Sequence, residues 1–547
     1  MKSLEVHNQP PPLVDYNLFR TDPVLESAVV NEGAGSVTET LDLFGARVGT
    51  AEVIEWGYLA NRNIPILHTH DQYGSRIDQV EFHPAWHSLM DLAITHGLHS
   101  LPWEGDASEF AHTTRIAQMY MSSQIEAGHF CPISMTTSVV PSLQMTESVA
   151  DLWLPRITTR SYDPTFRPAD KKSGVLLGMG MTEKQGGSDV RANTTEAFPV
   201  NGGGPGGEYR ITGHKWFVSA PMCDAFLILA QAPGGLSCFL LPRWTPDGQV
   251  NTLRLMRLKD KVGNRSNASS EIEFEDTYGE LVGYEGRGIP TIIEMVNGTR
   301  LDCTMAGASL MRQSLTQAAW HVKYRHAFGS ALIDKPLMQN VIADLEVETE
   351  VATLMMMRLA VAFDRAAVDP QEAAFKRIAL PIAKYWVTKQ TTPVVREAME
   401  CLGGNGYIEE SMMPRLFRES PVNAIWEGSG NVIALDLLRA VTREPDSVKA
   451  FFVDLEEFDD ANADVRAAVQ RAKDSLYNTS DPEAEARMMV ELLAKAWAAT
   501  LIVRHGDQDL LDAYSSSRLR GHHGSHFGTL ATDLPIESLA RRAIPAL

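Results

Sequence analysis

The stretch GMGMTEKQGGSDV, residues 178–190, lies where the character of the chain changes. Before it, apolar residues recur at intervals of three and four, most clearly in 83–101 and 110–128, which predicts a mostly helical region without competing strand alternation. After it, short apolar runs typical of β-strands are separated by Gly, Pro, Asn and Asp. These runs are residues 209–220, 225–232, 236–244 and 269–278. We therefore predict a helical domain over 1–177 and an antiparallel β domain over 178–288.

Long helical periods return after the β-like runs. Four segments carry apolar stripes at helical spacing, which predicts a helix bundle over 289–443. They are residues 292–325, 340–366, 372–402 and 432–443. The three methionines at 355–357 are predicted to fill the core. Residues 444–547 are predicted to form a C-terminal helical extension. The predicted fold is mainly α, with a central antiparallel β domain.

Composition limits the partners that this chain can have. It has 547 residues, 44% of them apolar and 22% charged, which is typical of a large globular protein. Its formal net charge of −20 repels polyanions, so binding of nucleic acid or an anionic membrane needs a local basic patch. The C-terminal extension as a whole is not such a patch, because it has 18 acidic and 11 basic residues.

The five cysteines lie far apart, without a CxxC pair or the cysteine and histidine spacing of zinc sites. This predicts a reducing compartment and no bound metal. The histidines of GHHGSHFG, residues 521–528, are predicted to lie in a solvated loop. The N-terminus has no apolar leader, and no uncharged apolar run approaches the ~18 residues that span a bilayer. We therefore predict a cytoplasmic protein.

Common catalytic signatures are missing from the sequence. It has no GxSxG, HExxH, P-loop or strand-linked GxGxxG motif, which argues against most hydrolases, kinases and classical NAD enzymes. Three Gly-rich polar clusters remain at structural transitions, where a cofactor would need close approach of the backbone. A further glycine tract, residues 201–208, lies between two β-like runs and predicts a hairpin loop.

The first cluster is residues 178–190. Gly186 and Gly187 beside Ser188 expose backbone N–H groups, and Thr182 offers a hydroxyl. These groups suit a phosphate or the edge of a polar ring, but an ordinary interdomain loop has the same composition.

The second cluster is HKWFVSAP, residues 214–221. Strand alternation places Trp216 and Val218 on one face and Phe217 and Ser219 on the other. An aromatic ring at this place either forms the wall of a site for a flat ring or fills the core.

The third cluster is AIWEGSGNVIALDLL, residues 424–438, a turn followed by an apolar helix. Its one acid before the helix, Glu427, lies between Trp426 and glycines. Such a carboxylate is either a base with a raised pKa or an ordinary surface acid.

Five motifs in this order resemble the flavin-binding and catalytic motifs of the acyl-CoA dehydrogenase superfamily. They are MTEKQGGSDV (181–190), HKWFVSAP (214–221), RHAFGSALIDKPLMQ (325–339), ECLGGNGY (400–407) and IWEGSGN (425–431). The resemblance covers about residues 100 to 440. It implies an N-terminal helical domain, a β-barrel or sandwich and a four-helix bundle, in agreement with the predicted domains.

The resemblance implies that the protein binds FAD. On the β side, the implied contacts are Met179, Met181, Thr182, Gly187, Ser188, Trp216, Phe217, Val218 and Ser219. Thr182 would bond the isoalloxazine edge and Ser188 the pyrophosphate. Arg325, Phe328, Gly403 and Gly404 would meet the adenine half of a neighbouring subunit's FAD, which implies a homotetramer built as a dimer of dimers. Ile425, Trp426, Gly428, Ser429 and Asn431 would close the flavin site.

The resemblance also places Glu427 at the catalytic base of the family. This base removes the α-proton of an acyl thioester, and the flavin accepts the β-hydride. Some relatives supply the base from an earlier helix, just before a conserved Arg. Here Thr299 precedes Arg300, so Glu427 is the candidate. Glu400 stands where the family has Gln, which would alter a nucleotide contact. The implied activity is weak dehydrogenation of a short branched acyl-CoA, similar to isovaleryl-CoA, with an electron acceptor that these motifs do not identify.

Two other functions stay open at this point. The extended N-terminus, the segment LKDKVGNRSNAS (258–269) and the C-terminal extension resemble the branch of the family associated with double-stranded DNA and protection from alkylating agents. Its DNA contacts would come from Arg439, Arg443, Arg518 and Arg520, although the bulk charge disfavours such binding. The other alternative is a flavin oxidase or monooxygenase acting on a small nitrogen compound.

Overall fold

The structure, a computed structural model, describes residues 5–458 and 462–547. The chain falls into two compact units. The helical unit comprises Met1–Ile54, Glu109–Ile125 and Arg300–Leu547, and the sheet unit comprises Glu55–Ser108 and Glu126–Thr299. Two helices, α3 (Ala51–Arg62) and α9 (Gly288–Tyr324), contribute residues to both units.

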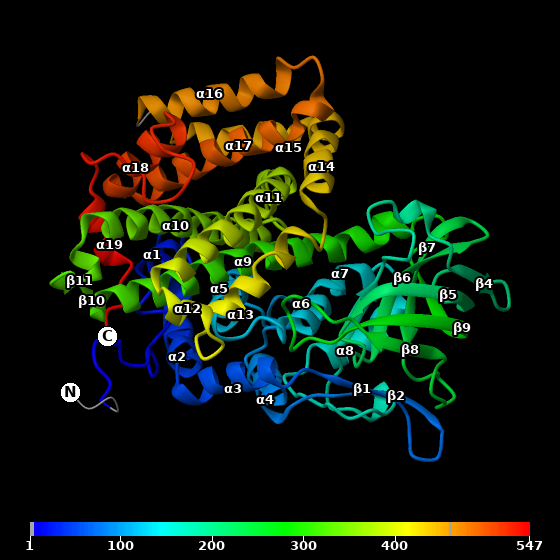
Figure 1. The fold of residues 1–547 in the computed structure, drawn as a ribbon. Coiled ribbons are helices and arrows are strands. Elements are labelled where there is room, and N and C mark those ends of the chain that lie inside the picture. Colours follow the sequence, from blue (N-terminus) through cyan, green and yellow to red (C-terminus); the bar gives the residue numbers. More distant parts are fainter. Residues whose placement is uncertain (1–4, 459–461) are drawn as a thin grey trace. The chain divides into compact units, whose positions relative to one another are not determined.

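The main sheet lies in the region predicted to be a β domain. Its strands are β3 (Leu177–Gly180), β4 (Glu196–Pro199), β5 (Glu208–Ser219), β6 (Ala225–Ala232), β7 (Gly235–Pro242), β8 (Leu253–Leu258) and β9 (Ser269–Val282). Strands β6, β4, β5, β9 and β7 pair in succession and β7 pairs back with β6, so the sheet closes into a barrel (Figure 1). Most pairs are antiparallel, but β3 and β4 pair with β6 in parallel, which corrects the wholly antiparallel prediction. Residues 200–207 connect β4 and β5 as the predicted hairpin loop.

The sheet unit also contains a hairpin within residues 1–177, a region predicted to be mostly helical with no competing strand pattern. Strands β1 (Ile66–His70) and β2 (Arg76–Glu81) pair with each other and lie beside β8 (Figure 1). The hairpin is short and largely exposed, so it lacks the buried apolar alternation by which strands are recognised in a sequence. The helices of this unit are α4 (Pro84–Thr95), α6 (Phe130–Ser138), α7 (Val140–Leu143) and α8 (Glu147–Ile157).

The helical unit contains the predicted bundle helices. Its helices before residue 444 are α1 (Pro23–Asn31), α2 (Thr38–Val48), α5 (Ala111–Ile125), α10 (Pro336–Arg365), α11 (Pro370–Cys401), α12 (Gly404–Tyr407), α13 (Met413–Glu419) and α14 (Gly430–Arg443). A two-stranded hairpin, β10 (His326–Ala327) and β11 (Ser330–Ala331), follows α9. Helix starts agree with local chemistry, since Pro370 stands at the first turn of α11 and the Asp369 carboxylate caps it.

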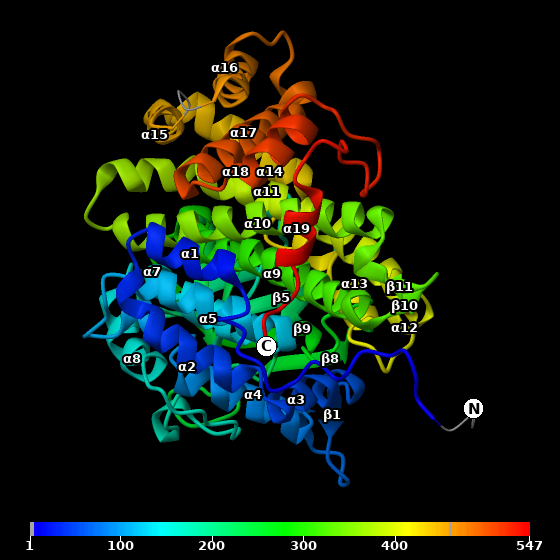
Figure 2. The ribbon, with the colours of Figure 1, turned by 90° about the vertical axis from the view of Figure 1, so that its left-hand side faces the viewer.

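Helix α10 is the core of the helical unit. It packs against α1, α5, α11, α17 and α19, and its residues from 342 to 362 are buried. The methionines at 355–357 are fully buried, as predicted. Figure 2 shows α19 lying across α10 near the C-terminus. In the part of the chain that the structure describes, none of the helices has the length and apolar character needed to cross a membrane.

The predicted C-terminal extension is helical and packs on the bundle. It contains α15 (Pro445–Glu456), α16 (Ala463–Tyr477), α17 (Pro482–His505), α18 (Gln508–Tyr514), a π-helical turn η8 (Ser515–Leu519) and α19 (Ile536–Arg542). Helices α15 and α17 contact α11, and α14 contacts α17, so these helices form a layer against α10 and α11 (Figure 1).

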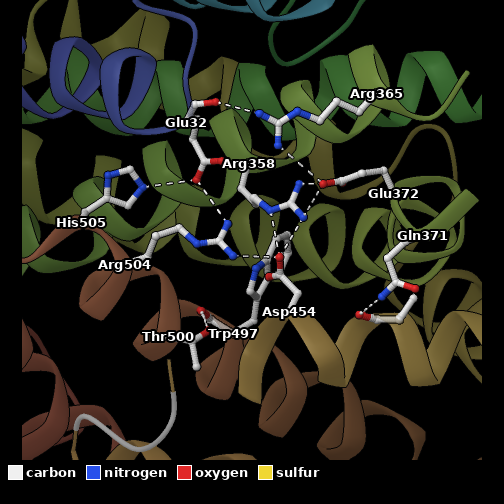
Figure 3. Close-up of polar contacts among 11 residues, drawn as sticks. Glu32, Arg358, Arg365, Gln371, Glu372, Asp454, Trp497, Thr500, Arg504 and His505 are labelled. Carbon is white, nitrogen blue, oxygen red and sulfur yellow. Dashed lines mark hydrogen bonds and ion pairs between the residues drawn. The ribbon is translucent and has the colours of Figure 1, made fainter. Parts of the chain in front are cut away.

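A buried network of ion pairs joins this layer to the bundle (Figure 3). Arg358 of α10 donates to Glu372 of α11 at 2.9 Å and to Asp454 of α15 at 2.8 Å. Arg504 of α17 also donates to Asp454, at 2.8 Å, and lies 3.5 Å from Glu32 beside α1. Burial works against the charged form of Arg358, but the facing carboxylates raise its pKa above the ordinary arginine value. The network therefore connects four helices and the end of α1.

Candidate active site

Thr182 and the glycines after it form a loop beyond the end of β3. A Cβ on Gly187 would lie 2.4 Å from Oγ1 of Thr182, and Gly186 has a φ of +141°, so both positions favour glycine. Gly187 and Ser188 are exposed. The loop therefore presents accessible backbone beside a hydroxyl, an arrangement that suits a phosphate or a ring edge.

Strand β5 carries a β-bulge at Trp216 and Phe217. Its pairing with β9 changes register between Lys215 and Val218, so simple alternation does not hold there. Val218 is buried, whereas the Phe217 side chain is 51% exposed. Trp216 is half-buried, with the Nζ of Lys259 at 3.5 Å from its ring centroid. The bulge thus presents the ring of Phe217, which a flat ligand can cover.

A buried ion pair braces the loop and the bulge. The Nζ of Lys215 lies 2.7 Å from Glu183, and both side chains are fully buried. Glu183 also accepts the backbone N–H of Thr194 at 2.6 Å. Burial opposes ionisation of Glu183, but the hydrogen bond from Lys215 and the backbone donors lower its pKa to about 2. Because Thr182 and Trp216 are the chain neighbours of this pair and their backbones are hydrogen-bonded, the pair holds both candidate groups in place.

Replacing Glu183 by Gln is expected to lower the free energy of unfolding by ~3 kcal/mol at pH 7, because it leaves the Lys215 ammonium buried without its carboxylate. The folded-state pKa of Glu183 is depressed, so its contribution is complete above the ordinary value of 4.5 and is lost as the pH falls toward 2. The difference between variant and wild type should therefore shrink below pH 4.5. Urea unfolding at a series of pH values measures this, and a difference independent of pH would contradict it.

Glu427 lies in the strained turn that leads into α14, here called the elbow (residues 425–429). Its φ is +57°, a conformation rare for a residue with a side chain, and Gly428 follows with a φ of +109°. Two buried cations hold the elbow by its carbonyl oxygens. Arg300 Nε donates to the carbonyl of Glu427 at 3.0 Å, and Lys384 Nζ donates to that of Gly428 at 2.5 Å. The backbone that directly follows the Glu427 side chain is therefore fixed at two successive carbonyls.

The two cations are themselves positioned by the bundle. Arg300 of α9 donates to Asp436 of α14 at 2.7 Å, and Arg377 of α11 reaches the other oxygen at 3.1 Å. Burial lowers the pKa of the Lys384 ammonium, and the nearby Glu427 carboxylate opposes this shift. The two cations therefore lie beside the candidate base and hold the turn that carries it.

A second part of the helical unit holds the residues implied for the nucleotide half of FAD. Phe328 is 95% exposed at the tip of the β10–β11 hairpin, where its φ of +51° and that of +87° at Gly329 fit a type I′ turn. Gly403 has a φ of +58°, and a Cβ on Gly404 would meet no atom within 4 Å. Both loops are open to a ligand.

The predicted cofactor residues are divided between the two units. The sheet unit holds Met179, Met181, Thr182, Gly187, Ser188, Trp216, Phe217, Val218 and Ser219, of which Met179 and Val218 are buried. The helical unit holds Arg325, Phe328, Gly403, Gly404, Ile425, Trp426, Gly428, Ser429 and Asn431. Within the sheet unit, the loop at 181–188 and the bulge at 216–219 are joined by the hydrogen bond from the N–H of Trp216 to the carbonyl of Thr182.

The four arginines predicted to contact DNA do not form one surface group. Arg518 is buried and pairs with Asp344 and Glu348 of α10 at 2.6 and 2.7 Å, so its guanidinium supports the fold. This corrects its assignment to a basic surface patch, because Asp344 and Glu348 lie one turn apart on α10 and both bind the guanidinium. Arg520 is half-exposed and pairs with Asp464. Arg439 and Arg443 are exposed on α14, and DNA binding there stays a prediction from the resemblance.

Sequence reasoning did not find Lys384 and Asp436. Lys384 is a lone charge in the apolar run ALPIAKYWV, residues 379–387, and a charge at such a position indicates a buried partner. Asp436 has no comparable signal, because an acid within an amphipathic helix ordinarily faces solvent. The loop at 521–528 was predicted to be solvated, but His523 in it lies 2.9 Å from the buried Asp344.

Comparison with known proteins places the chain in a family. Three family models match it: the AidB N-terminal domain over residues 8–164, the acyl-CoA dehydrogenase middle domain over 178–277, and the acyl-CoA dehydrogenase C-terminal domain over 286–442. The chain belongs to the acyl-CoA dehydrogenase family. Within the family it is similar to AidB of Escherichia coli strain K12, with 49% identity over 440 residues that cover 80% of each chain.

Solved structures share the fold. Caenorhabditis elegans ACDH-11 in complex with C11-CoA has a TM-score of 0.85 and 25% identity, and the match covers all of this chain and 94% of the other. An acyl-CoA dehydrogenase from Bacillus anthracis complexed with FAD has a TM-score of 0.64 at 16% identity, covering 91% and 81% of the two chains. The predicted fold class and the family resemblance are therefore confirmed.

Proposed function

We propose that this protein is an FAD-dependent acyl-CoA dehydrogenase that acts on a short branched acyl-CoA, with Glu427 as the base. The observation that carries the proposal is the elbow at Glu427. Two buried cations hold its strained backbone at the successive carbonyls of Glu427 and Gly428, and an ordinary surface acid needs no such support. The relative ACDH-11, solved with C11-CoA, supports a CoA thioester as the class of substrate.

The residues present fit a flavin nucleotide. Gly187 leaves room where a Cβ would meet Thr182, Gly186 lies in open space, and the exposed Phe217 ring offers a flat apolar surface. In this proposal Thr182 and Ser219 bind the ring edge and Ser188 binds the pyrophosphate. When bound, FAD supplies the acceptor for the β-hydride.

In the proposed reaction, the Glu427 carboxylate takes the α-proton and holds it. Lys384 and Arg300 act on this step indirectly, because they fix the carbonyls of Glu427 and Gly428 and so position the carboxylate. We also propose a homotetramer, in which the exposed Phe328 meets the FAD of a neighbouring copy. Its 95% exposure in the single chain supports a contact of this kind.

Anaerobic titration of the FAD-loaded protein with isovaleryl-CoA is expected to bleach the visible flavin absorbance, because the removal of two hydrogens from the substrate reduces the flavin. Pivaloyl-CoA is the matched control, since it has a similar acyl group without an α-hydrogen and should leave the spectrum unreduced. No bleaching by isovaleryl-CoA or longer acyl-CoAs at full FAD occupancy would contradict the proposal and favour a flavin oxidase or a DNA-associated flavoprotein.

A further inference from the structure

The segment at residues 8–11, here called the N-terminal strap, is bound to the β10–β11 hairpin. The Asn8 side chain donates to the carbonyl of His326 at 2.7 Å and accepts the N–H of His326 at 2.6 Å. The carbonyl of Asn8 accepts a hydrogen bond from Arg325 Nη1 at 2.7 Å. One residue thus makes three hydrogen bonds to the start of the hairpin, although more than 300 positions separate them.

The strap is also bound to the glycine loop and to α9. Gln9 accepts a hydrogen bond from Asn405 at 2.8 Å, directly after the glycines 403 and 404. The carbonyl of Pro11 accepts a hydrogen bond from the indole of Trp320 at 2.8 Å. Figure 2 shows the N-terminal segment passing close to α12 and the hairpin. Because Pro10, Pro11 and Pro12 restrict the backbone, the strap is a stiff connection.

The strap therefore binds both loops that are implied in nucleotide recognition. The guanidinium of Arg325 has five N–H donors, and the carbonyl of Asn8 orients it while leaving others for a ligand. We propose that the N-terminal strap is a positioning element for the nucleotide half of FAD, which holds the Arg325 hairpin and the 403–405 loop in the geometry that binds it. This inference rests on the proposed function, because it takes FAD as the ligand.

Replacement of Asn8 by Ala tests the strap, and replacement of the exposed Val6 by Ala is the matched control. Asn8 is exposed, so its loss leaves the core unchanged. The FAD dissociation constant, measured by the fluorescence change on binding, should rise about tenfold in the Asn8 variant, as expected for the loss of a few hydrogen bonds. In the absence of FAD, the amide of His326 should exchange its hydrogen about tenfold faster, because it loses its acceptor.

The outcomes separate the strap from the proposed function. If the Asn8 variant binds FAD with the affinity of wild type, the proposed role of the strap is wrong, whether or not exchange at His326 is faster. The proposed function would be unaffected. A wild-type protein that binds no FAD would overturn the proposed function and, with it, the assignment of the strap. Light scattering on the wild type and both variants checks that the dissociation constants are compared at the same oligomeric state.

Discussion

Glu427→Gln should lower the rate of flavin reduction by isovaleryl-CoA by about 10²–10⁴-fold, the usual contribution of a general base. Glutamine has the same shape and can still accept a hydrogen bond, but it cannot take the α-proton at neutral pH. The contacts that hold the elbow go to backbone carbonyls, so the substitution should leave the conformation unchanged. Stopped-flow absorbance under anaerobic conditions measures the rate, at equal FAD content.

Glu410→Gln is the control for this prediction, because Glu410 is an exposed carboxylate in the same unit. Its rate should stay within about twofold of wild type, since surface substitutions ordinarily have small effects. A Glu427→Gln variant that reduces its flavin at the rate of wild type would show that another group accepts the proton. A variant that loses FAD would show instead that Glu427 supports the cofactor site.

Arg358→Met should lower the free energy of unfolding by about 3–5 kcal/mol, the range for removal of one partner from a buried ion pair. The methionine fills most of the volume, but Glu372 and Asp454 lose the guanidinium that lies between them. Arg358 also stacks over the ring of Phe375 at 4.1 Å, and this contact is lost as well. Urea unfolding followed by circular dichroism measures the change.

Arg365→Met is a matched control from the same helix and the edge of the same network (Figure 3). Arg365 is 44% exposed and lies 3.8 Å from Glu372, so its loss should cost less than about 1 kcal/mol. Equal losses for the two variants would show that the network contributes no more than surface pairs do. Hydrogen exchange should also become faster in α15 and α17 of the Arg358 variant, since Asp454 connects these helices to α10.

Local patterns in the sequence predicted the elements well. The segments 340–366 and 372–402 correspond to α10 and α11, and 225–232 corresponds to β6. Periodicity succeeds here because long helices and buried strands repeat their apolar spacing over many residues. The exposed β1–β2 hairpin has too few buried positions to produce such a repeat. The bulge in β5 was also missed, because it depends on the register of β9, a strand about 50 residues further along.

The sequence by itself determined the fold class, the order of helical and β segments and the family, and it made Glu427 the candidate base. These depend on local spacing and on motifs. Only the tertiary structure decided what surrounds those motifs. The contacts of Lys384 with Gly428, of Arg518 with α10 and of Asn8 with His326 join positions 44, 170 and 318 residues apart. Which distant groups meet is set by the packing of whole helices and by the need of each buried charge for a partner, and neither is written in a local pattern.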